Sequence, residues 1–548
     1  MRHRVVGIDL GTTYSAVAVY DPDLLEAEVL SNRDGGGGAT TPSVVAFDRD
    51  TGDVLIGGAA KRSLARHPQD VVIEIKREMG AADGEPPEPR HVRFADRQLL
   101  PQQISALVLM KMKEVAEAEI GEDIRDAVIT VPAYFQEHQR AATKQAALLA
   151  GLYPRRLIPE PTAAAACYGV DRFQEARRAY LVYDLGGGTF DVSIIEVEGE
   201  DVIVVATSGD HHLGGGDFDD RLTEWAVDEL NRRDKIDVSK DPTARSKIKY
   251  HMEQAKMRLS SFQRTELSLS DLRPDEPPVL ELTREILEQR IEPDLERSLR
   301  SVRDAIQQAE HRGLRQEQLD GVLLVGGSTK IPAVKRKLVD YFERGDGFVK
   351  VDLDPAAVVA RGAAMVAARL EPTPPPFDIS RAKEVMEKDA DGDADGDADA
   401  PVRVRPIAEH SLGVALEDET CRRLIERGTP IPASSTQRDF TNSAPGPVTV
   451  QVYQGEQPLW SDNTWIGELR LLGIDETRPR HYHKFDLTYS LDQNGLLSVR
   501  AVYNQTGKSW EAQIAHQRGM RDEDALKVMH RELQELYRPP PAWEPPPP

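Results

Sequence analysis

At 548 residues the chain is too long for one hydrophobic core, which predicts several compact units. Its 69 Lys and Arg against 92 Asp and Glu give a formal net charge of −23. Such a surface repels nucleic-acid phosphates and anionic lipid head groups, so we expect no nucleic-acid or membrane partner. Cys167 and Cys421 signal neither a disulfide framework nor a zinc site. With no signal-type or membrane-spanning apolar run, we expect a cytoplasmic protein.

From Val5 to about Leu370 the sequence predicts strands and helices in alternation. Short runs of Val, Ile and Leu end at glycines, and longer amphipathic stretches such as Gln102 to Ala118 lie between them. Strands interleaved with helices are typical of an α/β architecture. We therefore expect residues 1–372 to form one large α/β region.

The composition changes abruptly after this region. Pro372 to Pro376 cannot hold a helix, and the tract from Asp389 to Ala400 alternates Asp with Ala and Gly, so it has almost nothing to bury. A segment of this kind stays solvated and repels itself. We expect residues 373–405 to be a Pro-rich and acidic linker.

Beyond the linker, apolar residues recur at every second position, the period of a strand with one buried face. Val448, Val450 and Val452 follow this pattern. Asn494-Gly495 is a strong hairpin signal, because both turn positions need positive φ. The pattern predicts a compact antiparallel β-domain over residues 406–516.

The C-terminal residues predict a single amphipathic helix from about Asp522 to Arg538. Its apolar side chains fall on one helical stripe, namely Leu526, Met529, Leu533 and Leu536. The proline-rich end from Pro539 stops this helix. We assign residues 517–548 to the helix and a proline-rich tail.

One internal repeat relates the two halves of the α/β region. The segment Val6–Thr13 (VGIDLGTT) recurs in outline as Val182–Thr189 (VYDLGGGT). In both, an apolar strand ends at an aspartate, glycines follow, and a hydroxyl residue precedes a second strand. This duplication predicts two related lobes whose loops face each other.

The repeated loops suit a phosphate group and a hydrated metal ion. Glycines bring backbone N–H groups against phosphate oxygens, and the threonines add hydroxyl donors. Asp9 and Asp184 would be repelled by phosphate, but they can hold the water shell of a bridging Mg²⁺. A third glycine loop, Val325–Ser328, would let a nucleoside approach closely. No P-loop or Rossmann glycine motif occurs at a strand–helix junction, which weighs against those two folds.

These motifs closely resemble the DnaK-type (seventy-kilodalton) heat-shock chaperones. The resemblance runs from residue 4 to about residue 370 and resumes around Ser411. Its motifs are GIDLGTTYS from Gly7, ITVPAYF from Ile129, EPTAAA from Glu160, YDLGGGTFDVS from Tyr183, HLGGGDFD from His212, GGSTKIP from Gly326, SLGVAL from Ser411 and VTVQVYQGE from Val448. The resemblance implies a two-lobed actin-like ATPase domain of duplicated ribonuclease-H-like fold, then a β-sandwich peptide-binding domain and a truncated helical lid.

The resemblance also implies a function: an ATP-dependent chaperone that hydrolyses ATP to ADP and phosphate and binds unfolded or extended polypeptide. Carried over residue by residue, it implies a catalytic set of Lys76, Glu160, Asp184 and Thr189. In that set Lys76 lies at the γ-phosphate, and Glu160 orients the attacking water. Asp9 and Asp184 would position hydrated Mg²⁺, and Tyr14 and Asp191 match contacts to K⁺. The other implied contacts to ATP or ADP are Gly11, Thr12, Thr13, Gly186, Gly187, Gly188, Gly215, Glu253, Lys256, Ser260, Gly326, Gly327, Ser328 and Lys330.

Further positions match the family's communication between domains and with co-chaperones. Pro132 and Arg140 match the relay that reports the nucleotide state, and Arg156 matches a position that docks J-domain co-chaperones. A J-domain protein and a nucleotide-exchange factor are therefore expected partners. The resemblance places four residues at the peptide pocket, namely Val414, Phe440, Val448 and Val450. On pattern alone, Val448 and Val450 also fit the core of a sandwich.

The chain departs from the family at the linker and the lid. The family's short apolar linker docks on the ATPase when ATP is bound, but here Arg403 and Arg405 stand where leucines are usual. Pro159 replaces an asparagine before Glu160, and Met257 replaces an arginine that some members use against the base. One helix cannot form a multi-helix lid. We hypothesise that peptide binds weakly and leaves fast in every nucleotide state.

Three other functions fit part of the sequence. A co-chaperone or regulator would bind ATP with little peptide-stimulated turnover, which the altered linker and short lid allow. An actin-like scaffold that assembles with ATP, or a small-molecule kinase of the same fold, would share the nucleotide loops. Neither of these two gives a role to the C-terminal β-domain.

Overall fold

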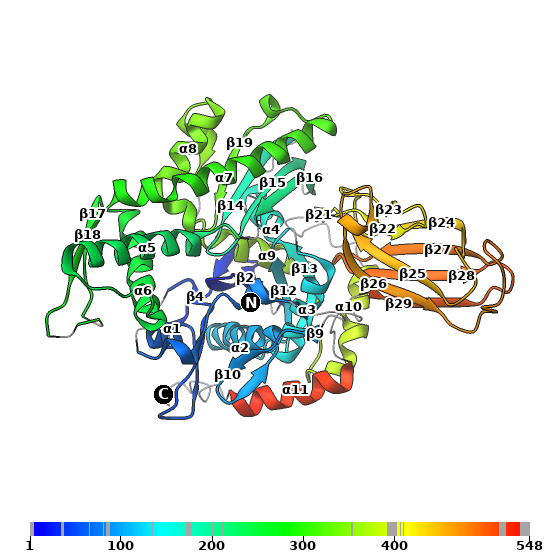
Figure 1. The fold of residues 1–548 in the computed structure, drawn as a ribbon, viewed down its shortest axis with the longest axis horizontal. Helices are drawn as coiled ribbons and strands as arrows, with labels where there is room; N and C mark the ends of the chain where they lie inside the picture. The colour runs from blue at the N-terminus through cyan, green and yellow to red at the C-terminus, as the bar shows by residue number, and fades with distance from the viewer. Residues whose placement is uncertain are drawn as a thin grey trace.

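The computed structural model describes residues 5–33, 38–64, 66–80, 82–83, 88–133, 135–170, 177–198, 201–210, 212–270, 272–273, 275–351, 354–391, 403–405, 407–408, 410–514 and 522–537. The acidic spacer predicted up to Ala400 lies outside these residues from position 392, as do Val402 in the linker and the proline-rich tail. Figure 1 shows two α/β lobes with a β-sandwich beside them.

The first lobe is built on a mixed sheet of order β13-β12-β1-β2-β3. Its strands are β1 (Val5–Asp9), β2 (Tyr14–Asp21), β3 (Glu26–Val29), β12 (Asp126–Val131) and β13 (Tyr153–Pro159). One face packs on α2 (Pro101–Ile120) and α3 (Glu137–Leu149), and the other packs on α4 (Glu160–Val170) and α9 (Val358–Ala367). Because both faces are covered, the central strands read as continuous apolar runs.

The second lobe repeats this arrangement. Its sheet has the order β20-β19-β14-β15-β16-β21. The strands are β14 (Arg178–Leu185), β15 (Phe190–Glu198), β16 (Asp201–Asp210), β19 (Gly321–Val325), β20 (Val349–Lys350) and β21 (Arg403–Arg405). The helices of this lobe are α5 (Gly215–Asp234), α6 (Pro242–Leu259), α7 (Arg284–His311) and α8 (Pro332–Phe342).

The duplication predicted from the sequence is present in the pairing of the strands. β1 forms an antiparallel hairpin with β2 and pairs in parallel with β12, just as β14 forms a hairpin with β15 and pairs in parallel with β19. Smaller elements extend the two lobes: β4 (Thr41–Pro42), β5 (Val45–Phe47), β6 (Val54–Ile56), α1 (Gly58–Ser63), β7 (Val71–Val72), β8 (Ala82–Asp83), β9 (Glu88–Pro89), β10 (Val92–Phe94), β11 (Arg97–Leu99), β17 (Arg264–Ser268) and β18 (Val279–Thr283).

The predicted β-domain is a sandwich of two four-stranded sheets, ordered β23-β22-β25-β26 and β24-β27-β28-β29. Their bounds are β22 (Leu412–Ala415), β23 (Cys421–Ile425), β24 (Ala433–Thr441), β25 (Val448–Gln454), β26 (Thr464–Leu471), β27 (Lys484–Leu491), β28 (Leu497–Tyr503) and β29 (Ser509–Gln513). A hairpin joins β27 to β28 at Asn494-Gly495 as predicted, but only Gly495 has positive φ (+75°), because the connection spans residues 492–496 and is not a two-residue turn. The side chains that alternate inward form one apolar core.

Part of the predicted linker is packed against the first lobe. Pro372 to Pro376 is not helical, as expected, but Thr373 donates its backbone N–H to Asp126 at 2.7 Å. The chain then forms a 3-10 turn (Ile379–Arg381) and α10 (Ala382–Asp391), a helix that the sequence analysis does not anticipate. Buried Ile379 and Val385 join the core of the first lobe, so an apolar stripe preceded the acidic tract.

The C-terminal helix α11 (Glu523–Leu536) forms where the sequence predicts it, with Asp522 capping its first turn. In this structure α11 packs on the first lobe, and its role as the truncated lid stays a prediction. Leu526 and Leu533 are buried in the core of the first lobe, and Figure 1 places α11 beside α2 and α10 at the base of that lobe. None of the helices among the described residues is both long and apolar enough to span a bilayer.

Candidate functional site

The two repeated loops meet across a cavity of about 510 Å³ between the lobes. One loop joins β1 to β2 and the other joins β14 to β15. A Cβ added at Gly187 would lie 1.8 Å from Thr13 Oγ1, and one at Gly188 would lie 2.5 Å from Thr12 Cγ2. The glycines are therefore required by the close approach of the two loops. The cavity is lined by all the nucleotide residues predicted from the sequence except Gly188 and Asp191.

Three aspartates gather where the loops meet. Burial and the neighbouring carboxylate of Glu160 raise the pKa of Asp9 to about 7. Burial, with Glu160 and Asp9 as further causes, raises the pKa of Asp184 well above its usual value, and Asp191 is shifted in the same direction. Asp9 and Asp184 line the same cavity, and the charge of Asp9 is one cause of the raised pKa of Asp184. Buried carboxylates held together in this way suit a site that binds a cation.

The donor set fits Mg²⁺ held through water. Asp9 and Asp184 both line the cavity, one from each lobe. Among the described residues there is no group of three or more His, Cys, Asp and Glu placed to enclose a metal directly. Mg²⁺ keeps several waters and takes one or two carboxylates together with substrate phosphates. The two aspartates match that requirement.

Lys76 and Glu160, to which the resemblance gives catalytic roles, form a buried ion pair at the cavity, and those roles stay a prediction. Lys76 comes from a 3-10 turn (Ile75–Glu78), and Glu160 is the first residue of α4. Their side chains are 5% and 10% exposed, so this is not the solvated surface lysine that a single sequence position would suggest. The pair places one cation and one anion beside the loops.

The third glycine loop and α6 form the opposite end of the cavity. Gly326 has φ +83°, and Ser328 donates to the carbonyl of Gly186 at 2.8 Å. Lys330 pairs with Asp354 at 2.8 Å. From α6, Glu253, Lys256, Met257 and Ser260 line the cavity. Sequence periodicity alone would place this face of α6 in solvent, and only the packing of α6 over the cleft turns it inward.

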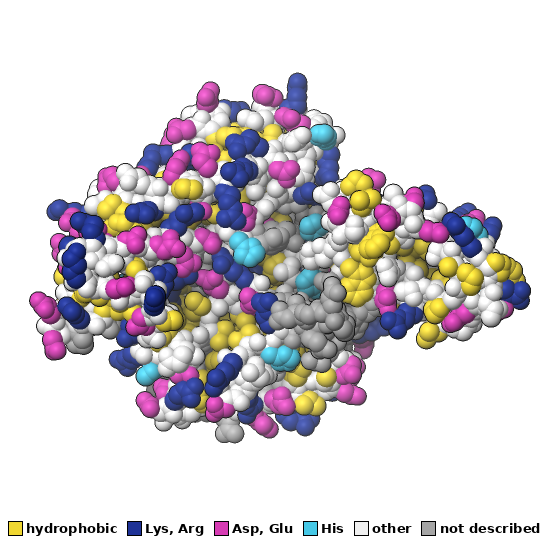
Figure 2. All heavy atoms as spheres, viewed as in Figure 1, with side chains coloured by type: hydrophobic (Ala, Val, Ile, Leu, Met, Phe, Trp, Pro, Cys, Tyr) yellow, Lys and Arg dark blue, Asp and Glu magenta, His cyan; other side chains and the backbone are white. Residues whose placement is uncertain are grey.

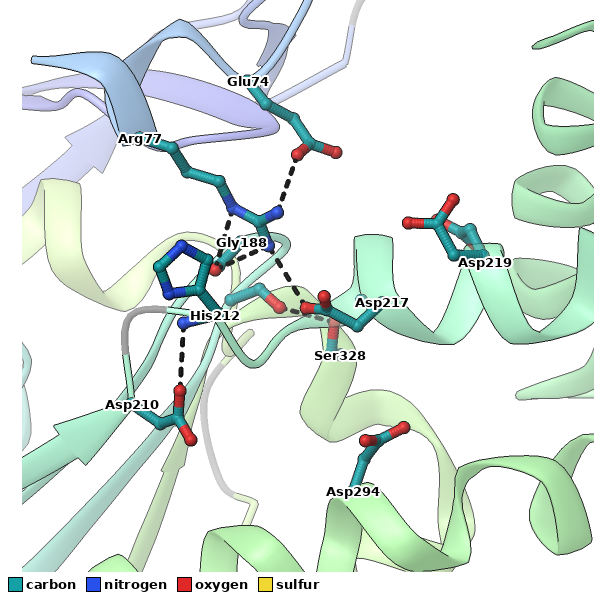
Figure 3. Close-up of polar contacts among 12 residues, drawn as sticks. Glu74, Arg77, Gly188, Asp210, His212, Asp217, Asp219, Asp294 and Ser328 are labelled. Atoms are coloured by element: carbon teal, nitrogen blue, oxygen red, sulfur yellow. Dashed lines mark hydrogen bonds and ion pairs between the residues drawn. The ribbon is translucent and has the colours of Figure 1, made fainter. Parts of the chain in front are cut away.

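Several residues that sequence reasoning missed also hold the lobes together. Lys61 on α1 pairs with Glu253 at 2.6 Å and donates to Tyr14 Oη at 2.8 Å. Arg77 donates to the carbonyl of Gly188 at 2.7 Å and pairs with Asp217 on α5 at 3.2 Å. Figure 3 shows Arg77 reaching Gly188, Asp217 and Glu74.

Some of these missed residues carried a signal in the sequence and one did not. Arg77 adjoins Lys76, and Asp217 lies inside the quoted motif from His212, so the sequence neighbourhood of the predicted site already pointed to both. Lys61 carried no such signal, because a single lysine on a short helix is usually solvated.

The predicted relay residues lie between the cleft and the β-sandwich. Pro132 follows β12, and the next residue, Ala133, donates its N–H to Asp191 at 3.1 Å. Arg140 on α3 donates to the carbonyl of Ala133 at 3.3 Å. A Cβ added at Gly495 of the sandwich would lie 3.5 Å from Arg140 Cδ. A continuous set of contacts therefore joins the nucleotide hairpin to the sandwich.

The sandwich docks on the first lobe through the loop between β27 and β28. Asn494 Oδ1 accepts from the backbone of Leu157 at 2.8 Å, and Glu137 accepts from the backbone of Leu497 at 3.0 Å. Arg156, the predicted J-domain contact, is next to Leu157 on β13. The linker strand β21 adds to the second lobe, with Val404 paired in parallel to Val202. Arg403 and Arg405 therefore do not prevent docking of the linker.

The predicted peptide-pocket residues lie in the core of the sandwich. Val414 and Val450 are 1% exposed, Val448 is 8% exposed, and Phe440 packs half-buried at the edge of this core. The structure thus favours the core interpretation of these valines, and their role in binding peptide stays a prediction. Glu417, which follows β22, pairs with Arg480 at 2.6 Å.

The surface gives no single charged face to the view in Figure 2. Acidic and basic side chains are interspersed over the two lobes, and hydrophobic side chains gather on the sandwich. The expectation that the acidic chain avoids nucleic acid stays a prediction.

The chain also matches a model of a known protein family. Residues 5–538 match the family described as Hsp70 protein. The match covers both lobes, the linker, the sandwich and α11, so it includes the cleft described above as well as the diverged C-terminal part. The protein therefore belongs to the Hsp70 protein family.

Proposed function

We propose that this protein is an ATP-hydrolysing chaperone whose β-sandwich binds extended polypeptide weakly and exchanges it fast. Family membership supports the coarser statement, an ATP-dependent chaperone that takes ATP or ADP with Mg²⁺ and acts on unfolded polypeptides with co-chaperones. The observation that carries the proposal is the closure of two related loops, with Asp9 and Asp184, around one cavity.

The Lys76–Glu160 pair supports the hydrolysis step. In the proposed mechanism, Lys76 faces the terminal phosphate and offsets its charge, while Glu160 accepts a hydrogen bond from the attacking water and aligns it. The hydroxyl groups of Thr12, Thr13 and Thr189 donate hydrogen bonds to the phosphates. Asp9 and Asp184 would hold Mg²⁺ through water, and the ion would supply positive charge that offsets the charge of the phosphates. Phosphoryl transfer needs positioning and charge stabilisation more than covalent help, and these residues offer both. A further role for K⁺ beside Tyr14 and Asp191 belongs to the same proposal.

Steady-state ATP hydrolysis with and without an unfolded polypeptide tests this function. We expect Mg²⁺-dependent affinity for ATP and ADP, and turnover that rises when the polypeptide is added. The contacts from Asp191 through Ala133 and Arg140 to Gly495 support this coupling. A purified protein without Mg²⁺-dependent affinity for either nucleotide would contradict the proposal at its first step.

The position of α11 supports fast exchange of peptide. A helix whose leucines are buried in the ATPase core is not available to cover the sandwich. His530 Nδ1 also donates to the carbonyl of Leu149 at 2.7 Å, and Tyr537 donates to Glu114 at 2.7 Å. We expect a labelled peptide to dissociate at similar rates in ADP and ATP. Dissociation slowed by orders of magnitude in ADP would contradict this part of the proposal.

A second candidate is a regulator of another chaperone that binds ATP but gives little peptide-stimulated turnover. The burial of Val414, Val448 and Val450 favours it, because a pocket built on these residues would have to open first. Normal nucleotide affinity without stimulation by unfolded polypeptide would select this candidate. Stimulation by a J-domain protein, lost in Arg156→Ala, would instead support the chaperone cycle.

A further inference from the structure

The loop between β14 and β15 has the backbone carbonyls of its three glycines held by donors from other elements. Gly186 accepts from the N–H of Gly215 at 3.0 Å, and Gly187 accepts from the N–H of Gly216 at 2.7 Å. Both donors belong to the start of α5, which is part of the same lobe as the loop. The carbonyl of Gly188 is held differently.

Arg77 holds the carbonyl of Gly188 and reaches it from the first lobe, across the cleft. Its Nε and Nη2 lie 3.1 and 2.7 Å from this oxygen. Nη2 also pairs with Asp217 of α5 at 3.2 Å, and Nη1 pairs with Glu74 at 3.0 Å, so two carboxylates fix the guanidinium (Figure 3). The planar fork of donors that an arginine presents is therefore used on three partners at once.

The backbone of Glu74 shows that the direction of Arg77 is built into the fold. Glu74 has φ +55°, in the left-handed region that a residue with a Cβ rarely adopts. It is the N-cap of the 3-10 turn that carries both Lys76 and Arg77. One residue in an unfavourable conformation thus aims two cations, the first at Glu160 and the second at Gly188. Such conformations gather at functional sites, where the surrounding contacts maintain them.

The held carbonyls determine where the N–H groups of the loop point. In a trans peptide the C=O of one residue and the N–H of the next point in opposite directions. Because the carbonyls of Gly187 and Gly188 face α5 and Arg77, the N–H groups of Gly188 and Thr189 point the other way. Gly187 and Thr189 line the cavity. Fixed N–H groups beside a phosphate stabilise the negative charge that develops there during transfer.

We propose that Arg77 is a positioning residue, which sets the Gly188–Thr189 peptide for phosphoryl transfer when the two lobes are closed. This inference rests on the proposed hydrolysis of ATP. Arg77 is not among the residues that line the cavity, so it acts through the loop and not on the nucleotide itself. Without the guanidinium, α5 still holds the other two carbonyls, and only the last peptide of the loop is misplaced. The rate of hydrolysis should therefore fall while nucleotide affinity is retained.

Single-turnover ATP hydrolysis and calorimetric ADP binding, both with the full chain, test the proposal. Arg77→Met keeps the length of the side chain, and we expect it to slow hydrolysis roughly 10- to 100-fold with the Kd for ADP within about threefold of the wild-type value. Arg77→Lys keeps the charge but not the fork, so it should recover only a small part of the rate. The matched control is Arg33→Met, which removes an exposed, ion-paired arginine and should change neither quantity.

A second variant tests the same contact without altering the arginine. Asp217→Asn leaves Arg77 less well fixed, so hydrolysis should slow by a smaller factor, and adding Arg77→Met to it should give no more than Arg77→Met alone. Unchanged hydrolysis in Arg77→Met, full recovery by Arg77→Lys, or a loss of ADP affinity as large as the loss of rate would overturn the inference while ATP binding stands. A wild-type protein that binds no nucleotide, or that binds ATP without hydrolysing it, would instead overturn the proposed function.

Discussion

The nucleotide cleft and the β-sandwich bury very different residues. In the cleft, burial raises the pKa of Asp9, Asp184 and Asp191, and the charges of neighbouring carboxylates raise it further. In the sandwich, Val414 and Val450 are buried where packing alone favours them. Buried carboxylates with raised pKa values point to a functional site, whereas buried valines are explained by packing. The cleft therefore indicates its chemistry by itself, and the sandwich does so only through the family.

Replacing Asp184 by Asn gives the largest expected effect. The change leaves the shape of the cleft but removes a charge that faces the metal and the phosphates. We expect ATP turnover to fall on the order of 100-fold, the scale found when one electrostatic group at a transition state is lost. Asp346→Asn, at a carboxylate whose side chain is 79% exposed, is the control. Unchanged turnover in Asp184→Asn would show that this buried carboxylate does not serve catalysis, so the cleft would no longer differ from the sandwich in that respect.

Replacing Leu533 by Ala tests which region α11 belongs to. The side chain is 1% exposed in the core of the first lobe, so the cavity left behind should cost about 2–5 kcal/mol of unfolding free energy. Hydrogen exchange should become faster in α3 and α10, with β25 and β28 unaffected. Val528→Ala, at an exposed position of the same helix, should change little. Faster hydrogen exchange in the sandwich alone would indicate that α11 covers the sandwich as a lid.

The buried carboxylates of the cleft should make the stability of the nucleotide-free protein depend on pH. Asp219 on α5 is buried and lines the cavity. Between 3.8 and about 6, folded Asp219 keeps a proton that the unfolded chain has lost. Stability from this group therefore falls as the pH rises through that window and is constant above it. Two pKa units correspond to about 3 kcal/mol. Urea unfolding of Asp219→Ala should show a shallower fall in stability over this window, because the raised pKa values of Asp9, Asp184 and Asp191 still contribute. An identical slope in both proteins would assign the whole fall to those other groups.

Replacing Val450 by Ala gives the smallest expected effect. If Val450 is a core residue, the sandwich should lose about 1–3 kcal/mol of stability, and ATP turnover should not change. Thr449→Ala, on the opposite face of β25, is the matched control. A fall in peptide affinity without any loss of sandwich stability would show that Val450 contacts peptide. The sandwich, like the cleft, would then contain buried residues that serve binding.

Local patterns predicted most of the elements correctly. The repeat around Asp9 and Asp184 predicted two related lobes, because a strand, a glycine turn and a hydroxyl residue are all specified within eight positions. The period of two predicted β25, and Asn494-Gly495 predicted the hairpin between β27 and β28. The stripe that includes Leu526 and Leu533 predicted α11 almost to its ends. Each of these signals lies within a short stretch of the sequence.

The sequence by itself determined the nucleotide loops, the sandwich and the C-terminal helix, since each depends on local turn chemistry and periodicity. Only the tertiary structure decided what those elements face. The sequence of an amphipathic helix shows that it has an apolar stripe but not which core receives that stripe, so only the structure showed that α11 packs on the first lobe. For the same reason the roles of Lys61 and Arg77 emerged only when separate elements closed over one cavity.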